Sequence, residues 1–252
     1  MNNLINLDNL PINVKESIVS YASDIVRIYQ DNLKSIVIYG SATQPEDFSQ
    51  KHSNINLLII LNEITLAELK KAVKLVNGMG RKKKIVPLFL TMTHIQTSID
   101  VFPVEFLEMK ENNVVIYGED VFEGMKIRPE NIRLQCEEQI KGKIIRLRQA
   151  YLELSTKPEA MEKLMAGSLT SLLPIFRNIL RIKTAQIPPI KKGQIIDGLA
   201  REYSIDTTPL LNILESKNQK KKIPKNNVES VFEQYLEILQ GLAIAVDQLK
   251  VG

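Results

Sequence analysis

The stretch that decides the fold is Ile36-Val-Ile-Tyr-Gly-Ser41, which is followed after 12 residues by Asn54-Ile-Asn-Leu-Leu-Ile-Ile60. Both runs are rich in aliphatic and β-branched residues, which favour strands. The first run stops at a Gly-Ser pair, and the second is apolar on both faces at its far end, as buried strands are. We therefore predict strands over 35–39 and 54–61, joined by a polar loop over 42–53.

Further elements of the same kind are predicted on either side of this pair. Apolar residues recur at helical spacing over 14–32, and Pro11 lies near the start of that helix. A second helix is predicted over 65–76, where Thr65 and Glu68 have the spacing of a capping box, and Gly78 and Gly80 follow its end. The remaining pattern predicts strands over 85–90, 101–109 and 114–117, with a short helical turn over 93–99.

The pattern changes after Arg128-Pro129, where strand-like runs give way to long segments of helical period. Pro158 fits the first turn of one of these helices, and the pair Pro188-Pro189 breaks the chain after it. We predict helices over 130–154, 158–183, 193–203, 208–215 and 228–250, with a basic loop over 218–227. The fold class is therefore α+β: a mixed sheet with flanking helices over 1–125, followed by an all-α helical bundle over 126–252.

Composition excludes several classes of protein. No apolar run in the 252 residues approaches the roughly 20 that a membrane-spanning helix needs, and the N-terminal stretch lacks the features of a secretory signal. The single cysteine, Cys136, excludes an intrachain disulfide and a Cys-rich zinc site. Two histidines, His52 and His94, are too few for a histidine metal cage. We expect a cytoplasmic protein that makes no use of a membrane.

Charge is divided unevenly between the two predicted domains. Residues 1–125 hold 12 Lys and Arg against 15 Asp and Glu, a balance of −3, whereas residues 126–252 hold 21 against 14, a balance of +7. The positive half attracts polyanions to some degree, although a solvated lysine-rich helical surface explains the same excess. The basic runs Arg81–Lys84 and Lys220–Lys222 are likewise explained either by contact with phosphates or by an ordinary solvated surface.

In its spacing, the deciding stretch resembles the DNA polymerase β-type nucleotidyltransferase superfamily. The signature of that family is a strand ending in Gly-Ser, a loop, and a strand that begins with two carboxylates one residue apart. A third carboxylate follows from a later strand in an apolar–acid–apolar setting, which Val104-Glu105-Phe106 matches. The two-domain layout also resembles the bacterial enzymes that transfer nucleotides to aminoglycosides.

The resemblance implies a particular site chemistry. The paired carboxylates and the third acid hold two Mg²⁺ ions, which bind the nucleoside triphosphate and stabilise the pyrophosphate leaving group. Gly40 and Ser41 occupy the position that binds phosphate, because glycine allows a close approach and serine offers a hydroxyl and an N–H. Asn54 and Asn56 stand where the family has its paired carboxylates, so that only Glu105 remains of the three acids.

This departure decides the functional expectation. Mg²⁺ prefers charged oxygen ligands, so two amides in place of two carboxylates weaken the metal site. Asp47, Asp100 and Glu108 are other acids nearby in the sequence, but odd spacing on the predicted strand turns Glu108 away from Glu105. Simpler interpretations also exist: an ordinary turn at Gly40-Ser41, polar loop residues at 54 and 56, and a surface acid at 105.

Three functional hypotheses follow. The first is a catalytically degenerate nucleotidyltransferase that binds a nucleotide, or that acts through a protein partner or self-association of the helical domain. The second is an active Mg²⁺-dependent enzyme that moves a nucleoside monophosphate from a nucleoside triphosphate to a hydroxyl, with Glu105 as its base or metal ligand. The third is a nucleic-acid-associated scaffold that uses the basic helical domain.

Overall fold

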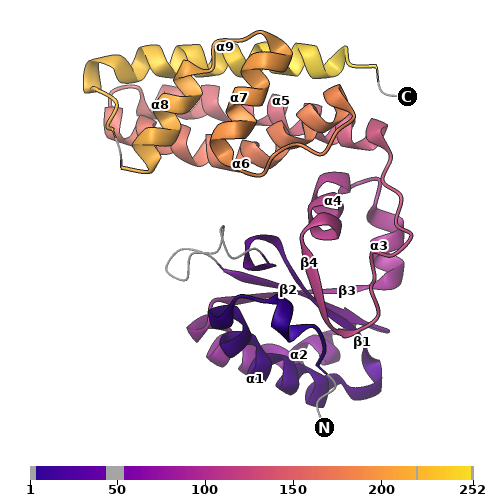
Figure 1. Cartoon of the computed structure of the whole chain (residues 1–252). Coiled ribbons are helices and arrows are strands. Elements are labelled where there is room, and N and C mark those ends of the chain that lie inside the picture. Colours follow the sequence, from indigo (N-terminus) through magenta and orange to yellow (C-terminus); the bar gives the residue numbers. More distant parts are fainter. Residues whose placement is uncertain (1–3, 44–53, 220, 251–252) are drawn as a thin grey trace. The chain divides into compact units, whose positions relative to one another are not determined.

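The computed structural model describes residues 4–43, 54–219 and 221–250 (Figure 1). The chain divides into two compact units, Met1–Lys126 and Ile127–Gly252. The change of sequence pattern placed this division after residue 125. None of the described helices is both long and apolar enough to cross a membrane.

A four-stranded mixed sheet forms the centre of the first unit, with the strand order β3-β2-β1-β4. Strand β1 pairs antiparallel with both β2 and β4, whereas β3 pairs parallel with β2. The strands predicted over 35–39, 54–61, 85–90 and 114–117 are therefore confirmed. Their bounds are Leu33–Tyr39 for β1, Ile55–Leu61 for β2, Ile85–Thr91 for β3 and Asn113–Gly118 for β4.

Helices α1 (Ile12–Tyr29) and α2 (Leu66–Leu75) cover one face of this sheet (Figure 1). Alternate residues of β2, such as Leu57 and Ile59, point toward these helices and are fully buried with Ile18, Ile25 and their neighbours. Helix α2 continues into a π-helical turn over Val76–Gly80, where Gly80 is buried. The side chains at the intervening positions of β2 therefore lie on the opposite face of the sheet, which carries the candidate site.

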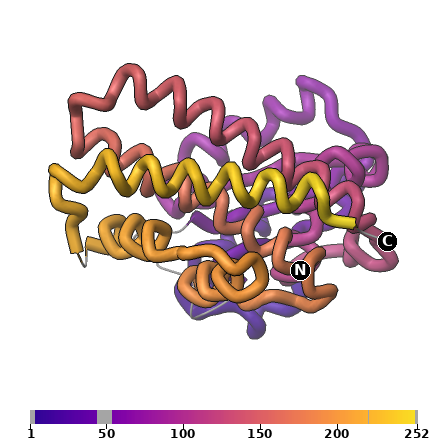
Figure 2. The backbone as a smooth tube through the Cα atoms, turned by 90° about the horizontal axis from the view of Figure 1, so that it is seen from above, coloured from indigo at the N-terminus to yellow at the C-terminus, as the bar shows by residue number. Residues whose placement is uncertain are grey.

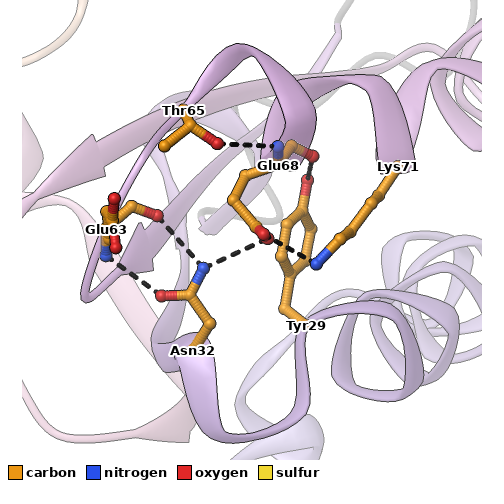
Figure 3. Close-up of polar contacts among 6 residues, drawn as sticks. All are labelled: Tyr29, Asn32, Glu63, Thr65, Glu68 and Lys71. Carbon is orange, nitrogen blue, oxygen red and sulfur yellow. Dashed lines mark hydrogen bonds and ion pairs between the residues drawn. The ribbon is translucent and has the colours of Figure 1, made fainter.

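A small polar network fixes the start of α2 (Figure 3). Thr65 Oγ1 accepts a hydrogen bond from the Glu68 N–H at 3.2 Å, so the predicted N-cap is confirmed. The Glu68 carboxylate binds Lys71 Nζ at 2.7 Å and Asn32 Nδ2 at 3.2 Å. Asn32 also accepts from the Glu63 N–H at 3.0 Å and donates to the Glu63 carbonyl at 3.1 Å. These contacts tie the end of the first helix to the loop that follows β2.

The strand predicted over 101–109 is wrong, because this segment forms a turn followed by helix α4, Pro103–Glu111. Pro103 occupies the first turn, where its missing N–H costs nothing and its fixed φ favours a helix. Pro103, Phe106 and Met109 are buried at a spacing of three, which is the period of a helix and not of a strand. Helix α3 (Met92–Ser98) confirms the helical turn predicted just before it.

The second unit consists of helices, and the five that the sequence predicts are confirmed. Helices α5, α6 and α9 pack against one another, and α5 and α9 run side by side in both views (Figures 1 and 2). Their bounds are Pro129–Leu154 for α5, Pro158–Thr184 for α6, Lys192–Tyr203 for α7, Thr208–Lys217 for α8 and Val228–Asp247 for α9. Short 3₁₀ turns occupy Leu7–Asn9, Gln30–Asn32, Gly40–Thr43 and Lys225–Asn227.

Candidate functional site

The Gly40-Ser41 pair begins a 3₁₀ turn directly after β1. Gly40 has a φ of 76°, a conformation that side chains disfavour, so glycine is needed here. Its N–H donates to the Asn112 carbonyl at 2.8 Å, and its own carbonyl accepts from Thr43 Oγ1 at 2.8 Å. The backbone N–H and carbonyl of Gly40 are thus both hydrogen-bonded, which fixes the turn. Ser41, the next residue of the turn, is therefore the candidate for binding a phosphate.

Asn54 and Asn56 lie where β2 begins. Asn54 is exposed immediately before the strand, and Asn56 is half-buried as the second residue of the strand. A Cβ added to Gly40 would lie 3.4 Å from Asn56 Nδ2, so the structure brings the glycine turn and this amide together. Because Ile55 and Leu57 point into the core beneath α1, Asn56 points to the other face of the sheet.

Register shows which residues stand beside Asn56 across the sheet. Tyr39 of β1 is its antiparallel partner, and Asn113 of β4 pairs with Tyr39 in turn. On the other side, the parallel partner of Asn56 is Val86 of β3, whose side chain is 46% exposed. This row of four positions therefore offers two amides, one hydroxyl and one apolar side chain. Burial raises the pKa of the Tyr39 hydroxyl, which keeps it protonated and able to donate a hydrogen bond.

Glu105 lies in a different setting from the one that the sequence predicts. It is exposed in the first turn of helix α4, between the buried Val104 and Phe106, rather than on a strand. Glu108 is three residues further along the same helix, so the two carboxylates share a side, contrary to the expectation from a strand. Asp100 is exposed in the turn that precedes α4. Asp47 lies outside the described residues.

The donor chemistry at the start of β2 fits Mg²⁺ poorly. Asn54 and Asn56 supply neutral carbonyl oxygens, whereas Mg²⁺ is bound in proteins through carboxylates, phosphates and water. Across the part of the chain that the structure describes, no three His, Cys, Asp or Glu side chains gather closely enough to hold a metal ion. Amide and hydroxyl groups are, however, suitable hydrogen-bond partners for a phosphate.

Three contributors to this site were missed in the sequence: Tyr39, Asn112 and Asn113. Nothing in their local sequence marks them, because Tyr39 lies beside Asn56 through the pairing of β1 with β2, and Asn112 and Asn113 reach the site at the end where β4 pairs with β1. The basic run over 81–84 is partly structural, since Lys83 Nζ donates to the Ser17 carbonyl at 3.0 Å and to Ser20 Oγ at 2.8 Å.

No protein-family model matches the chain, and no curated protein matches it in sequence. Among solved structures, it is similar to the spectinomycin adenyltransferase AAD(9) from Enterococcus faecialis, solved with ATP and spectinomycin. The TM-score is 0.59 at 16% identity, and the match covers 89% of this chain and 98% of that one. A match of this length spans both units. The chain is therefore similar in fold to this adenyltransferase over both units, as the resemblance in its sequence predicted.

Proposed function

We propose that the protein is a catalytically degenerate nucleotidyltransferase that binds a nucleoside triphosphate with little dependence on Mg²⁺. The observation that carries this proposal is the pair Asn54 and Asn56 at the start of β2, beside the Gly40 turn, in a nucleotidyltransferase fold. The similar structure contains ATP, which makes a nucleotide the first ligand to test.

The chemistry of the amide explains why binding and catalysis separate here. A pair of carboxylates repels a triphosphate unless Mg²⁺ lies between them, so such a site needs the metal even to bind its ligand. An asparagine carries no charge and has two N–H donors, so Asn56 can bind a phosphate oxygen directly. Ser41 supplies a further donor at the same end of the sheet. Transfer of the nucleotide loses its main source of charge stabilisation when the metal is held weakly.

Calorimetric titration of ATP with and without Mg²⁺ tests this proposal. We expect the same dissociation constant within about twofold in both conditions, because no pair of carboxylates needs to be screened. Binding that strengthens about tenfold or more with Mg²⁺ would contradict it and favour the active enzyme. In that case Glu105→Gln should abolish Mg²⁺-dependent pyrophosphate release.

Restoring the acids provides the complementary test. The double variant Asn54→Asp/Asn56→Asp should bind Mg²⁺ more tightly than the parent and should make ATP binding dependent on Mg²⁺. Asn218→Asp/Asn227→Asp adds the same two charges in the second unit and serves as the matched control. Equal Mg²⁺ affinity in the two double variants would contradict the assignment of residues 54 and 56.

A nucleotide that is bound and not consumed suits a regulatory role. We propose that binding of a cytoplasmic nucleotide changes how the helical unit binds a protein partner or a second copy of the chain. Its excess of seven positive charges over 126–252 leaves nucleic acid as the competing partner. Binding to nucleic acid would fall steeply with salt, whereas binding between proteins changes less.

A further inference from the structure

A cavity of about 290 Å³ lies between α5 and α6 of the helical unit, and none of its lining residues belongs to the proposed nucleotide site. Its volume is at the lower end of the range for small-molecule pockets, which suits a compact ligand better than an extended chain. The lining residues are Lys143, Arg146, Leu147, Lys163, Leu164, Gly167 and Ser168.

Three of the seven lining residues are cationic and none is acidic; Lys143 is half-buried, and Arg146 and Lys163 are exposed. Within the described ranges, no ion pair involves Lys143, Arg146 or Lys163. By contrast, Lys141 lies on the same helix and binds the Glu137 carboxylate at 2.5 Å. Like charges that line one cavity without acidic partners create a positive potential that favours the binding of an anion there.

The surroundings of the cluster point the same way. Burial and the neighbouring charge of Arg146 lower the pKa of Lys143, so these two cations are close enough to repel each other. The pKa of Glu159 is lowered mainly by Lys225, whose Nζ lies 3.1 Å from its carboxylate, and least by Lys163.

The floor of the cavity is apolar. Leu147 and Leu164 both line it; Leu147 is 1% exposed and Leu164 is half-buried, so Leu164 offers most of the hydrocarbon surface of the two. A Cβ added to Gly167 would meet nothing within 4 Å, which leaves the surface of α6 open at that point. The Ser168 hydroxyl is hydrogen-bonded to the Tyr235 hydroxyl at 2.9 Å within the core, so it belongs to the helix packing.

We propose that this cavity binds a small organic phosphate. Lys143, Arg146 and Lys163 hold the phosphate, and the apolar part of the ligand lies on Leu147 and Leu164. A phosphate monoester has three terminal oxygens and a charge near −2, which suits a cavity lined by three cations. A nucleic acid spreads one charge per phosphate along a strand and would need an extended groove. This site is independent of the proposed nucleotide site, because all its residues belong to α5 and α6.

Phenyl phosphate is the probe, titrated calorimetrically into the full chain in the presence of EDTA. We expect one-to-one binding that weakens about tenfold or more in Lys143→Gln/Lys163→Gln, because two charge-assisted contacts are lost. Arg148→Gln is the matched control: Arg148 is an exposed cation on the same helix that lines a different cavity. It should leave phenyl phosphate binding unchanged.

Gly167→Leu separates loss of the ligand from loss of the fold. Leucine fills the open space above the cavity and should weaken phenyl phosphate binding. It also favours the helix over glycine, so the thermal midpoint should not fall.

Four outcomes would overturn the proposal: no binding of phenyl phosphate, equal binding by the parent and the lysine double variant, phenol bound as tightly as phenyl phosphate, or inorganic phosphate bound as tightly. Either of the first two results would show that the cavity is not the binding site. Tight binding of phenol would show that the cations do not hold the ligand, and tight binding of inorganic phosphate would show that the apolar residues do not contribute. Failure of ATP to bind near Asn56 would affect none of these readouts.

Discussion

Two buried tyrosines differ in whether their hydroxyl groups are satisfied. The Tyr21 hydroxyl is buried without a hydrogen-bond partner among the described residues, whereas the Tyr235 hydroxyl pairs with Ser168 Oγ at 2.9 Å. Tyr21→Phe should therefore raise the free energy of unfolding by about 1 kcal/mol, and Tyr235→Phe should lower it by about 1 kcal/mol. Urea denaturation of both variants measures the difference. A loss of stability in Tyr21→Phe would show that its hydroxyl is satisfied in solution.

The same residue gives the protein an alkaline pH dependence. Burial raises the pKa of Tyr21 to about 12, well above its ordinary value of 10.0. The folded state therefore favours the neutral hydroxyl: its contribution to stability is complete below about pH 10 and is lost as the pH rises toward 12. Tyr21→Phe should lose less stability than the parent between pH 9 and pH 11, with the remaining loss due to other tyrosines such as Tyr29.

At the scale of single residues, the sequence located the parts of the candidate site that are local in the chain. Gly40, Ser41, Asn54 and Asn56 follow directly from two strand ends and the spacing between them. The local pattern assigns Tyr39 to a strand and gives it no role in the site, because its position beside Asn56 depends on the register between β1 and β2.

Two glycines with similar backbone angles differ in how much space a side chain would have. Gly118 at the end of β4 has a φ of 75°, and Gly124 has a φ of 70°. A Cβ on Gly118 would lie 2.0 Å from the Lys34 carbonyl oxygen, whereas a Cβ on Gly124 would meet nothing within 4 Å. Gly118→Ala should therefore cost about 3 kcal/mol or more, and Gly124→Ala about 1 kcal/mol. Chemical denaturation of the pair checks this, and equal costs would contradict the clash.

Elements with a long, regular pattern were predicted well, and short ones were not. The five helices of the second unit have clear periods and proline or glycine punctuation, so their type and order followed from the sequence. The segment around Glu105 is a short apolar run. Over so few residues, the pattern of apolar and polar side chains fits both a strand and one face of a helix. Proline is rare inside a strand, so Pro103 was the signal that could have favoured the helix over the strand.

At the scale of the whole molecule, each unit has its own buried core, and the two therefore need not unfold together. We expect Gly118→Ala to lower the thermal transition of the first unit and to leave that of the second within about 1 °C. Differential scanning calorimetry, combined with hydrogen exchange to assign each transition, measures both. If protection fell equally over residues 4–126 and 127–250, the chain would unfold as one cooperative body.

The pairing of β1 with β4 has a consequence for how the protein is made. Strand β1 lies between β2 and β4, and Ile36 pairs with Tyr117, far along the chain. During synthesis on the ribosome, one edge of β1 therefore waits without its partner until residues beyond β4 have left the exit tunnel. An exposed strand edge readily pairs with another chain. Nascent chains in which β4 is still inside the tunnel should therefore need chaperones most, and those in which Gly118 has emerged should need them far less.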